Sequence, residues 1–171
     1  PTVLVVEHDR ECPPALFGEW LTEAGCDLAV CRPYAGEELP APAPYDGLVV
    51  LGGPMGANDD AQHPWLAPVK ELLRDARATD LPTLGICLGH QLAAVAFGGS
   101  VAVNPFGQQV GLLGVGWTAA ARADRLFESL SWPRRAVQWN DDVVDELPDG
   151  ATVLAATDRA EVQVVRYAPL M

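Results

Sequence analysis

The sequence has 171 residues, of which 49% are hydrophobic and 20% are charged, a composition typical of a globular protein with one sizeable core. Lys and Arg number 11 and Asp and Glu number 23, which gives a net charge of −12 and argues against direct binding to nucleic acid or anionic lipid. Because no apolar run approaches the roughly 20 residues that cross a bilayer, and no signal peptide is visible, we expect a soluble, cytoplasmic protein.

The alternation of apolar and polar segments in the first half of the chain predicts an α/β fold. A continuous β-branched run opens the chain, as in strands that are covered on both faces of a parallel sheet. Prolines and glycines mark where the following elements begin and end. The predicted order is a strand at 2–6, a helix at 15–24, a strand at 28–31, a surface loop at 33–44, a strand at 47–51, a helix at 64–78, a strand at 83–86 and a helix at 88–97. This order is typical of a three-layer α/β/α, doubly wound, mostly parallel sheet, which we expect as one domain over residues 1–171.

Two of these strands end in residues with functional potential. Gly52-Gly53 follows the strand at 47–51, and Cys87 follows the strand at 83–86. Ligands of doubly wound sheets bind beyond the carboxyl ends of the strands, and a right-handed crossover through the helix at 64–78 would bring these two ends together. The alternative for the glycines is an ordinary turn.

The stretch Gly85-Ile-Cys87-Leu-Gly89 has the form of a strand-to-helix elbow that exposes a nucleophile. The flanking glycines would be needed because the tight turn leaves no room for a Cβ. The positive end of the next helix would favour the thiolate form of Cys87. The backbone N–H groups of Leu88 and Gly53 could converge on a developing oxyanion, while Gln91, one turn further, could bind an amide or carboxylate of a substrate. The alternative is that Cys87 is a small buried hydrophobe between packing glycines.

The other cysteines lack the spacing of a metal or disulfide site. Cys12, Cys26 and Cys31 form no C-x-x-C pair, and we expect them to be reduced. The sequence predicts neither a metal site nor a cofactor, and it contains no ATP-binding G-x-x-x-x-G-K-[ST] loop.

Gly85-Ile-Cys-Leu-Gly-His-Gln91 closely resembles the nucleophile signature of class I glutamine amidotransferases, and most of all that of stand-alone members labelled GMP synthase-like. The resemblance runs from Val3 to the end of the chain and includes residues 45–55, 63–66 and 97–99. It implies a flavodoxin-like fold, Cys87 as the attacking thiol, the amides of Gly53 and Leu88 as the oxyanion hole, and Gln91 as a glutamine contact. The implied reaction is hydrolysis of glutamine or a γ-glutamyl compound through a γ-glutamyl thioester, and the possible ammonia acceptor is a synthetase domain or subunit.

The second half of the chain is predicted to be mainly strands. They lie at 100–103, at 112–118 on an antiparallel edge of the same sheet, at 136–139, and in a hairpin of 152–156 with 161–167; a short helix is predicted at 124–130.

Two loops of the second half depart from the family pattern. Gln109 stands where the family commonly has glutamate, and we assign it no catalytic role. Asn140-Asp141-Asp142 corresponds to a family loop, usually His-Gly-Asp, that touches substrate through its backbone, and we expect Trp139, Asn140 and Asp141 to take part in substrate binding. Aspartate in place of glycine could crowd the substrate, or Asp141 and Asp142 could receive an amine; the alternative is that these acids are solvated turn residues.

The family's His-Pro-Glu segment, which supplies the catalytic base, does not occur in this sequence. His8, His63 and His90 are poor substitutes, because one follows the first strand, one precedes a helix and one lies along the elbow helix. We expect the chain to be truncated before that segment and nearly inactive as it stands. The alternative functions are a non-catalytic binding or regulatory domain and a γ-glutamyl-polyamine-type hydrolase.

Overall fold

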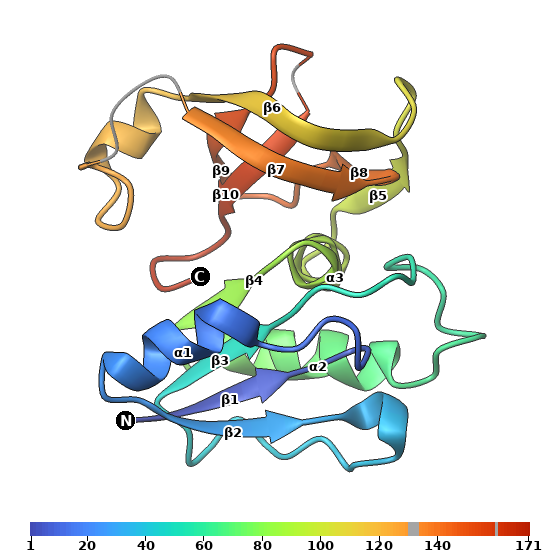
Figure 1. Ribbon diagram of the computed structural model, residues 1–171, viewed down its shortest axis with the longest axis vertical. Coiled ribbons are helices and arrows are strands. Elements are labelled where there is room, and N and C mark those ends of the chain that lie inside the picture. The colour runs from blue at the N-terminus through green and yellow to red at the C-terminus, as the bar shows by residue number, and fades with distance from the viewer. Residues whose placement is uncertain (130–133, 160) are drawn as a thin grey trace. The chain divides into compact units, whose positions relative to one another are not determined.

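The computed structural model describes residues 1–129, 134–159 and 161–171 (Figure 1). The chain divides into two compact units. The first comprises Pro1–Phe97 together with Pro169–Met171, and the second comprises Gly98–Ala168. None of the helices in the described ranges is long and apolar enough to span a membrane.

The first unit contains a four-stranded parallel sheet with the order β2-β1-β3-β4. Its strands and helices alternate along the chain as predicted, with ends that differ by one or two residues from those expected. The elements are β1 (Thr2–Val6), α1 (Ala15–Glu23), β2 (Asp27–Cys31), the 3-10 helix η1 (Pro33–Ala35), β3 (Gly47–Val50), α2 (Leu66–Ala78), β4 (Thr83–Gly85) and α3 (Leu88–Ala96).

Both faces of this sheet are covered, which explains why its central strands are continuously apolar. On one face Val5 and Val49 pack with Phe17 and Leu21 of α1. The alternating residues of the same strands point to the other face, where α3 contacts Val50 and α2 packs beside α3. The sheet is therefore the middle of three layers (Figure 1).

The second unit is built mainly from antiparallel strands. One sheet has the order β10-β9-β6-β7, and β5 pairs with β8 in a separate ribbon. The elements are β5 (Ser100–Val103), β6 (Gln109–Trp117), the 3-10 helix η2 (Ala120–Ala123), β7 (Arg134–Asn140), β8 (Asp142–Glu146), β9 (Thr152–Ala156) and β10 (Val162–Arg166).

Two expectations for the second half were wrong. The strand expected at 112–118 on the edge of the parallel sheet is part of β6, which pairs with β7 and β9 in a separate antiparallel sheet. A parallel crossover takes a dozen or more connecting residues, usually helical. In the described part of this unit, η2, with four residues, is the only helix. The strands are therefore connected without a helical crossover and pair in antiparallel fashion.

The helix expected at 124–130 is also wrong, because residues 124–129 do not form a helix. Residue 130 lies outside the described residues. The segment forms turns in which the Asp124 carboxylate accepts the Leu126 N–H at 2.9 Å. Asp124 also binds the Arg166 guanidinium through both carboxylate oxygens, at 2.7 and 2.8 Å. A carboxylate engaged in these contacts stabilises the turn at the expense of a longer helix.

Candidate active site

Cys87 lies at the junction of β4 and α3, where the chain makes a sharp turn. Its backbone angles are φ 54° and ψ −108°, and it occupies the N-cap position of α3. A positive φ is rare for a residue with a side chain, and such strain typically amounts to about 1–3 kcal/mol. The predicted elbow at Cys87 is therefore present in the backbone, and the side chain is exposed.

The glycines on either side of Cys87 are required by close backbone packing, as predicted. A Cβ at Gly89 would lie 2.1 Å from the carbonyl oxygen of Val50, and one at Gly85 would lie 2.6 Å from the carbonyl oxygen of Gly89. Atomic contacts this short do not occur, so neither position can hold a side chain without a shift of the backbone. These contacts fix the start of α3 against β3.

The Gly52-Gly53 loop lies next to Cys87, as the predicted crossover requires. A Cβ at Gly52 would lie 3.3 Å from the Cβ of Cys87 and 3.8 Å from its Sγ. At Gly53 a Cβ would lie 2.6 Å from the Sδ of Met55 and 3.1 Å from a methyl carbon of Leu88. The loop after β3 and the start of α3 are therefore packed together.

Two opposing effects set the acidity of the Cys87 thiol. The surrounding protein atoms partly desolvate the sulfur and raise the pKa of Cys87, and this effect is the larger one. The backbone N–H of Leu88 lowers the pKa, as expected at the start of a helix. The start of the helix thus favours the thiolate through the Leu88 N–H, as expected, but desolvation of the sulfur outweighs this contribution.

Gln91 and His90 lie in the first turn of α3. The Gln91 backbone N–H donates to the carbonyl oxygen of Cys87 at 3.1 Å, and Gln91 is only 8% exposed. Burial lowers the pKa of His90 to about 4, so its imidazole is neutral at pH 7. The backbone hydrogen bond thus holds Gln91 one helical turn from Cys87. The lowered pKa makes His90 a poor proton acceptor at neutral pH.

His8, which the sequence analysis noted only as following the first strand, lies in this region. It follows β1, is 0% exposed, and accepts a hydrogen bond at Nδ1 from the indole Nε1–H of Trp65 at 3.3 Å. Burial lowers the pKa of His8 to about 4. His63 packs edge-on against Trp65 with ring centroids 5.0 Å apart. The position of His8 two residues after a buried strand was the available sign of its burial.

Trp139, Asn140 and Asp141 belong to the second unit. Trp139 lies on β7 and is 74% exposed. Asn140 ends β7 and donates from Nδ2 to the carbonyl oxygen of Asp142 at 3.2 Å, while the carbonyl oxygen of Asp141 accepts the Asn104 N–H at 2.8 Å. The predicted loop is shorter than expected, because Asp142 already begins β8, a strand that the sequence analysis missed.

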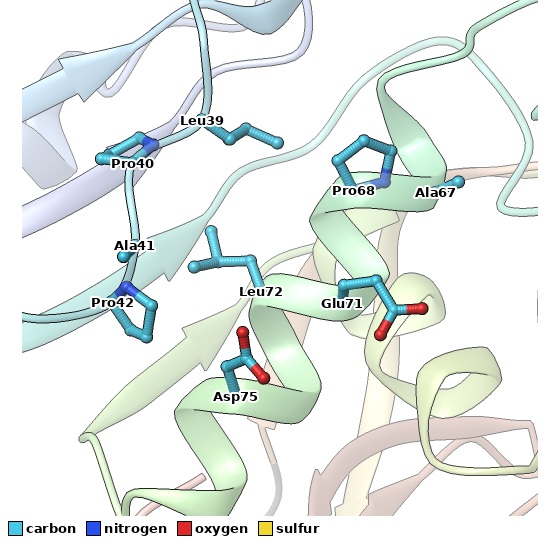
Figure 2. A pocket seen from close by; sticks show the side chains of 9 residues that line it. All are labelled: Leu39, Pro40, Ala41, Pro42, Ala67, Pro68, Glu71, Leu72 and Asp75. Carbon is cyan, nitrogen blue, oxygen red and sulfur yellow. The ribbon is translucent and has the colours of Figure 1, made fainter.

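A groove of about 480 Å³ lies on another part of the first unit, between the loop that precedes β3 and one face of α2 (Figure 2). Its lining is mostly apolar, with the two carboxylates of Glu71 and Asp75 at one side. Cys87, Gly53 and Gln91 are absent from its lining, so the groove is separate from the elbow. The lining residues are Leu39, Pro40, Ala41, Pro42, Ala67, Pro68, Glu71, Leu72 and Asp75.

The remaining cysteines are free thiols, as predicted. Burial raises the pKa of Cys31, whose Sγ lies 3.6 Å from the carbonyl oxygen of Glu38. Burial and nearby acids, chiefly Asp9, raise the pKa of Cys12. Within the described ranges, His, Cys, Asp and Glu side chains form no group of three or more that could hold a metal ion.

The parallel sheet, the strained cysteine at a strand-to-helix junction and the adjacent glycine loop together define an α/β protein with a nucleophile elbow. The profile of the family described as glutamine amidotransferase class-I matches residues 19–169. The chain therefore belongs to the class I glutamine amidotransferase family, and the predicted three-layer, doubly wound fold is confirmed.

Individual relatives support the same assignment. The chain is 34% identical over 126 residues to a subunit of the glutamine-hydrolysing GMP synthase of Halobacterium salinarum, and the alignment covers 74% of this chain and 61% of the relative. It is 30% identical over 125 residues to gamma-glutamyl peptidase 3 of Arabidopsis thaliana, covering 70% of this chain and 49% of the relative. The chain thus spans less than two thirds of the length of these two relatives.

The fold is also that of a solved structure from the same family. A glutamine amidotransferase from Thermotoga maritima superposes with a TM-score of 0.90 at 28% sequence identity. The superposition covers 98% of this chain and 72% of the Thermotoga chain.

Proposed function

We propose that the protein is a glutamine amidotransferase-type hydrolase in which Cys87 attacks the γ-carbonyl of glutamine or of a γ-glutamyl compound. The observation that carries this proposal is the strained backbone of Cys87 at the start of α3, held by two glycines that tolerate no side chain. Strain of this kind persists where it serves a function. Membership of the family supports the same reaction class.

In the proposed reaction the thiol of Cys87 loses its proton and Sγ bonds to the γ-carbonyl carbon. The carbonyl electron pair moves to oxygen, and the backbone N–H groups of Leu88 and Gly53 donate to this oxyanion, a contribution typically of about 3 kcal/mol per donor. Collapse of the adduct breaks the carbon–nitrogen bond, and the amine leaves after taking up a proton. Water then cleaves the thioester and regenerates the thiol.

The proton transfers need a base, and the described histidines near the elbow do not supply a good one. His8 and His90 both have a pKa of about 4, so neither ring takes up a further proton readily at neutral pH. We infer that formation of the thioester with an activated substrate is within reach of this chain, whereas turnover of glutamine is slow.

The finer assignments of substrate and partner rest on the relatives. The GMP synthase of Halobacterium salinarum is glutamine-hydrolysing by its name, and a gamma-glutamyl peptidase acts on γ-glutamyl compounds by its name. We propose that Gln91 contacts the amino-acid part of the substrate, that Trp139, Asn140 and Asp141 contribute to the same binding, and that a synthetase domain or subunit receives released ammonia.

The test uses the 4-nitrophenyl γ-ester of glutamic acid, because nitrophenolate leaves without needing a proton. We expect a burst of one nitrophenolate per chain and its loss in Cys87→Ala. Nitrophenyl butyrate, which lacks the amino-acid part, serves as the control for unspecific acylation and should react much more slowly. A burst that persists in Cys87→Ala, or the absence of a burst in the unaltered chain, would contradict the proposal.

A second candidate is a non-catalytic domain that binds glutamine in the same place. The observation that favours it is the raised pKa of the Cys87 thiol, which makes the residue less nucleophilic at neutral pH. This candidate predicts that calorimetry detects glutamine binding while neither acylation nor ammonia release occurs. Measurable glutamine turnover that disappears in Cys87→Ala would exclude it.

A further inference from the structure

The His8 imidazole is fixed in one tautomer and one orientation. The Trp65 indole N–H donates to Nδ1 at 3.3 Å, so Nδ1 carries no proton, and the neutral ring holds its proton on Nε2. Trp65 is the N-cap residue of α2, and His8 follows β1. This bond therefore joins the end of the first strand to the start of the second helix.

Packing alone does not explain an imidazole at this position. His8 is 0% exposed, and its Nε2 has no hydrogen-bond partner among residues 1–129, 134–159 and 161–171. Burying a polar group without a partner costs about 1–3 kcal/mol, whereas a hydrocarbon side chain of similar size would fill the space without that cost. A polar ring retained at such a cost indicates a role beyond filling the core.

The ring is attached next to the glycine that is proposed to stabilise the oxyanion. A Cβ at Gly53 would lie 3.0 Å from the Cβ of His8, closer than ordinary van der Waals contact. The Sδ of Met55 and a methyl carbon of Leu88 would lie 2.6 and 3.1 Å from the same Cβ. Three side chains thus crowd the side of Gly53 on which a Cβ would lie, and one of them, His8, is itself tied to the start of α2 by the hydrogen bond from Trp65.

We propose that His8 is a positioning residue of the oxyanion hole, held by Trp65 and holding in turn the backbone of Gly53. This inference rests on the proposed function, because it assigns the Gly53 N–H to the oxyanion. The His8 ring does not exchange protons in the reaction. Its hydrogen bond to Trp65 holds the Cβ of His8 against Gly53 and so limits the movement of the Gly53 peptide, which keeps the N–H aimed at the developing charge. Displacement of a catalytic group by about 1 Å can lower a rate by about 100-fold.

The test compares two reactions of the same sulfur. Acylation of Cys87 by the nitrophenyl γ-ester passes through an oxyanion, whereas alkylation by iodoacetamide does not and reports only on the thiol. The ratio of the two rate constants therefore isolates the oxyanion hole from changes in thiol pKa or exposure. The variants are His8→Leu, which removes the acceptor, Trp65→Phe, which removes the donor, and His8→Asn, whose Oδ1 can again accept from Trp65.

We expect the ratio to fall about 10-fold or more in His8→Leu and in Trp65→Phe, and to recover in His8→Asn to within about threefold of the unaltered chain. Trp20→Phe is the matched control, since Trp20 is 60% exposed on α1 and its loss should leave the ratio unchanged. If His8→Leu does not fold, Trp65→Phe decides the question.

An unchanged ratio in folded Trp65→Phe would overturn the inference, and so would a parallel fall of both rates, which indicates a merely structural role. If the unaltered chain alkylates but is not acylated, the proposed function fails, and this inference fails with it. If His8→Leu, Trp65→Phe and His8→Asn are all acylated at the normal rate, the proposed function stands and only the role of His8 is excluded.

Discussion

Cys87 combines a reactive side chain with a backbone that residues bearing a Cβ rarely adopt. Its φ of 54° and ψ of −108° are favourable mainly for glycine. The backbone contacts of Gly85 and Gly89 hold the turn in place, so the strain at Cys87 is imposed by its neighbours. Strain of this kind lowers the stability of the fold.

This strain predicts an unusual order of stability for two substitutions. Glycine in an ordinary position destabilises a protein by about 0.5–1 kcal/mol relative to alanine. At position 87 we expect the reverse, with Cys87→Gly more stable than Cys87→Ala by about 1 kcal/mol, because glycine relieves the positive φ. Urea denaturation of the two variants measures the difference. A Cys87→Ala variant that is the more stable of the two would show that the turn is unstrained.

The junction of β4, Cys87 and α3 is the element on which the site depends. Gly89 lies where the helix backbone approaches β3, and a Cβ there would meet the Val50 carbonyl carbon at 2.8 Å as well as its oxygen. Both partners are backbone atoms, which cannot swing aside as a flexible side chain can.

Gly89→Ala is therefore expected to destabilise the protein by about 3 kcal/mol, at the upper end of the usual cost of overpacking. Gly114→Ala on β6 is the matched control, because no heavy atom lies within 4 Å of a Cβ at that glycine, and it should change stability by less than about 1 kcal/mol. Thermal unfolding of the two variants provides the comparison. Equal unfolding temperatures would contradict the close approach of α3 to β3.

The same element shows what could be predicted from the sequence. The β-branched runs and the glycines that follow β3 specify a parallel sheet through local patterns, and the predicted strands and helices of the first unit are confirmed. Residues 124–129 and β8 depend on distant partners instead. Arg166 binds Asp124, and β5 pairs with β8; contacts between residues so far apart leave no periodic pattern in the sequence.

In the candidate site, too, only features with a local sequence pattern could be predicted. The spacing of Gly85, Cys87 and Gly89 could be interpreted because a tight turn needs glycine at fixed offsets. The partial desolvation of the Cys87 sulfur, which outweighs the effect of the Leu88 N–H on its pKa, and the bond between Trp65 and His8 arise from residues far apart in the chain. Neither has a local signature.

At the scale of the whole molecule, the four cysteines occupy different environments. Cys31 is buried, Cys12 and Cys26 are partly exposed, and Cys87 is exposed. Desolvation by surrounding protein atoms raises the pKa of Cys12, Cys31 and Cys87, so acidity alone does not single out Cys87. We therefore expect selective reaction at Cys87 to depend on recognition of the amino-acid part of a substrate and on the proposed oxyanion donors.

The most direct test of this account is the labelling of the chain with a diazoketone analogue of glutamine, 6-diazo-5-oxo-L-norleucine, followed by peptide mapping of all four cysteines. The account predicts a label on Cys87 alone, slowed by an excess of glutamine, while iodoacetamide also modifies Cys12 and Cys26. Equal labelling of Cys87 and Cys12 or Cys26 by the diazoketone would contradict a glutamine-specific nucleophile at the elbow.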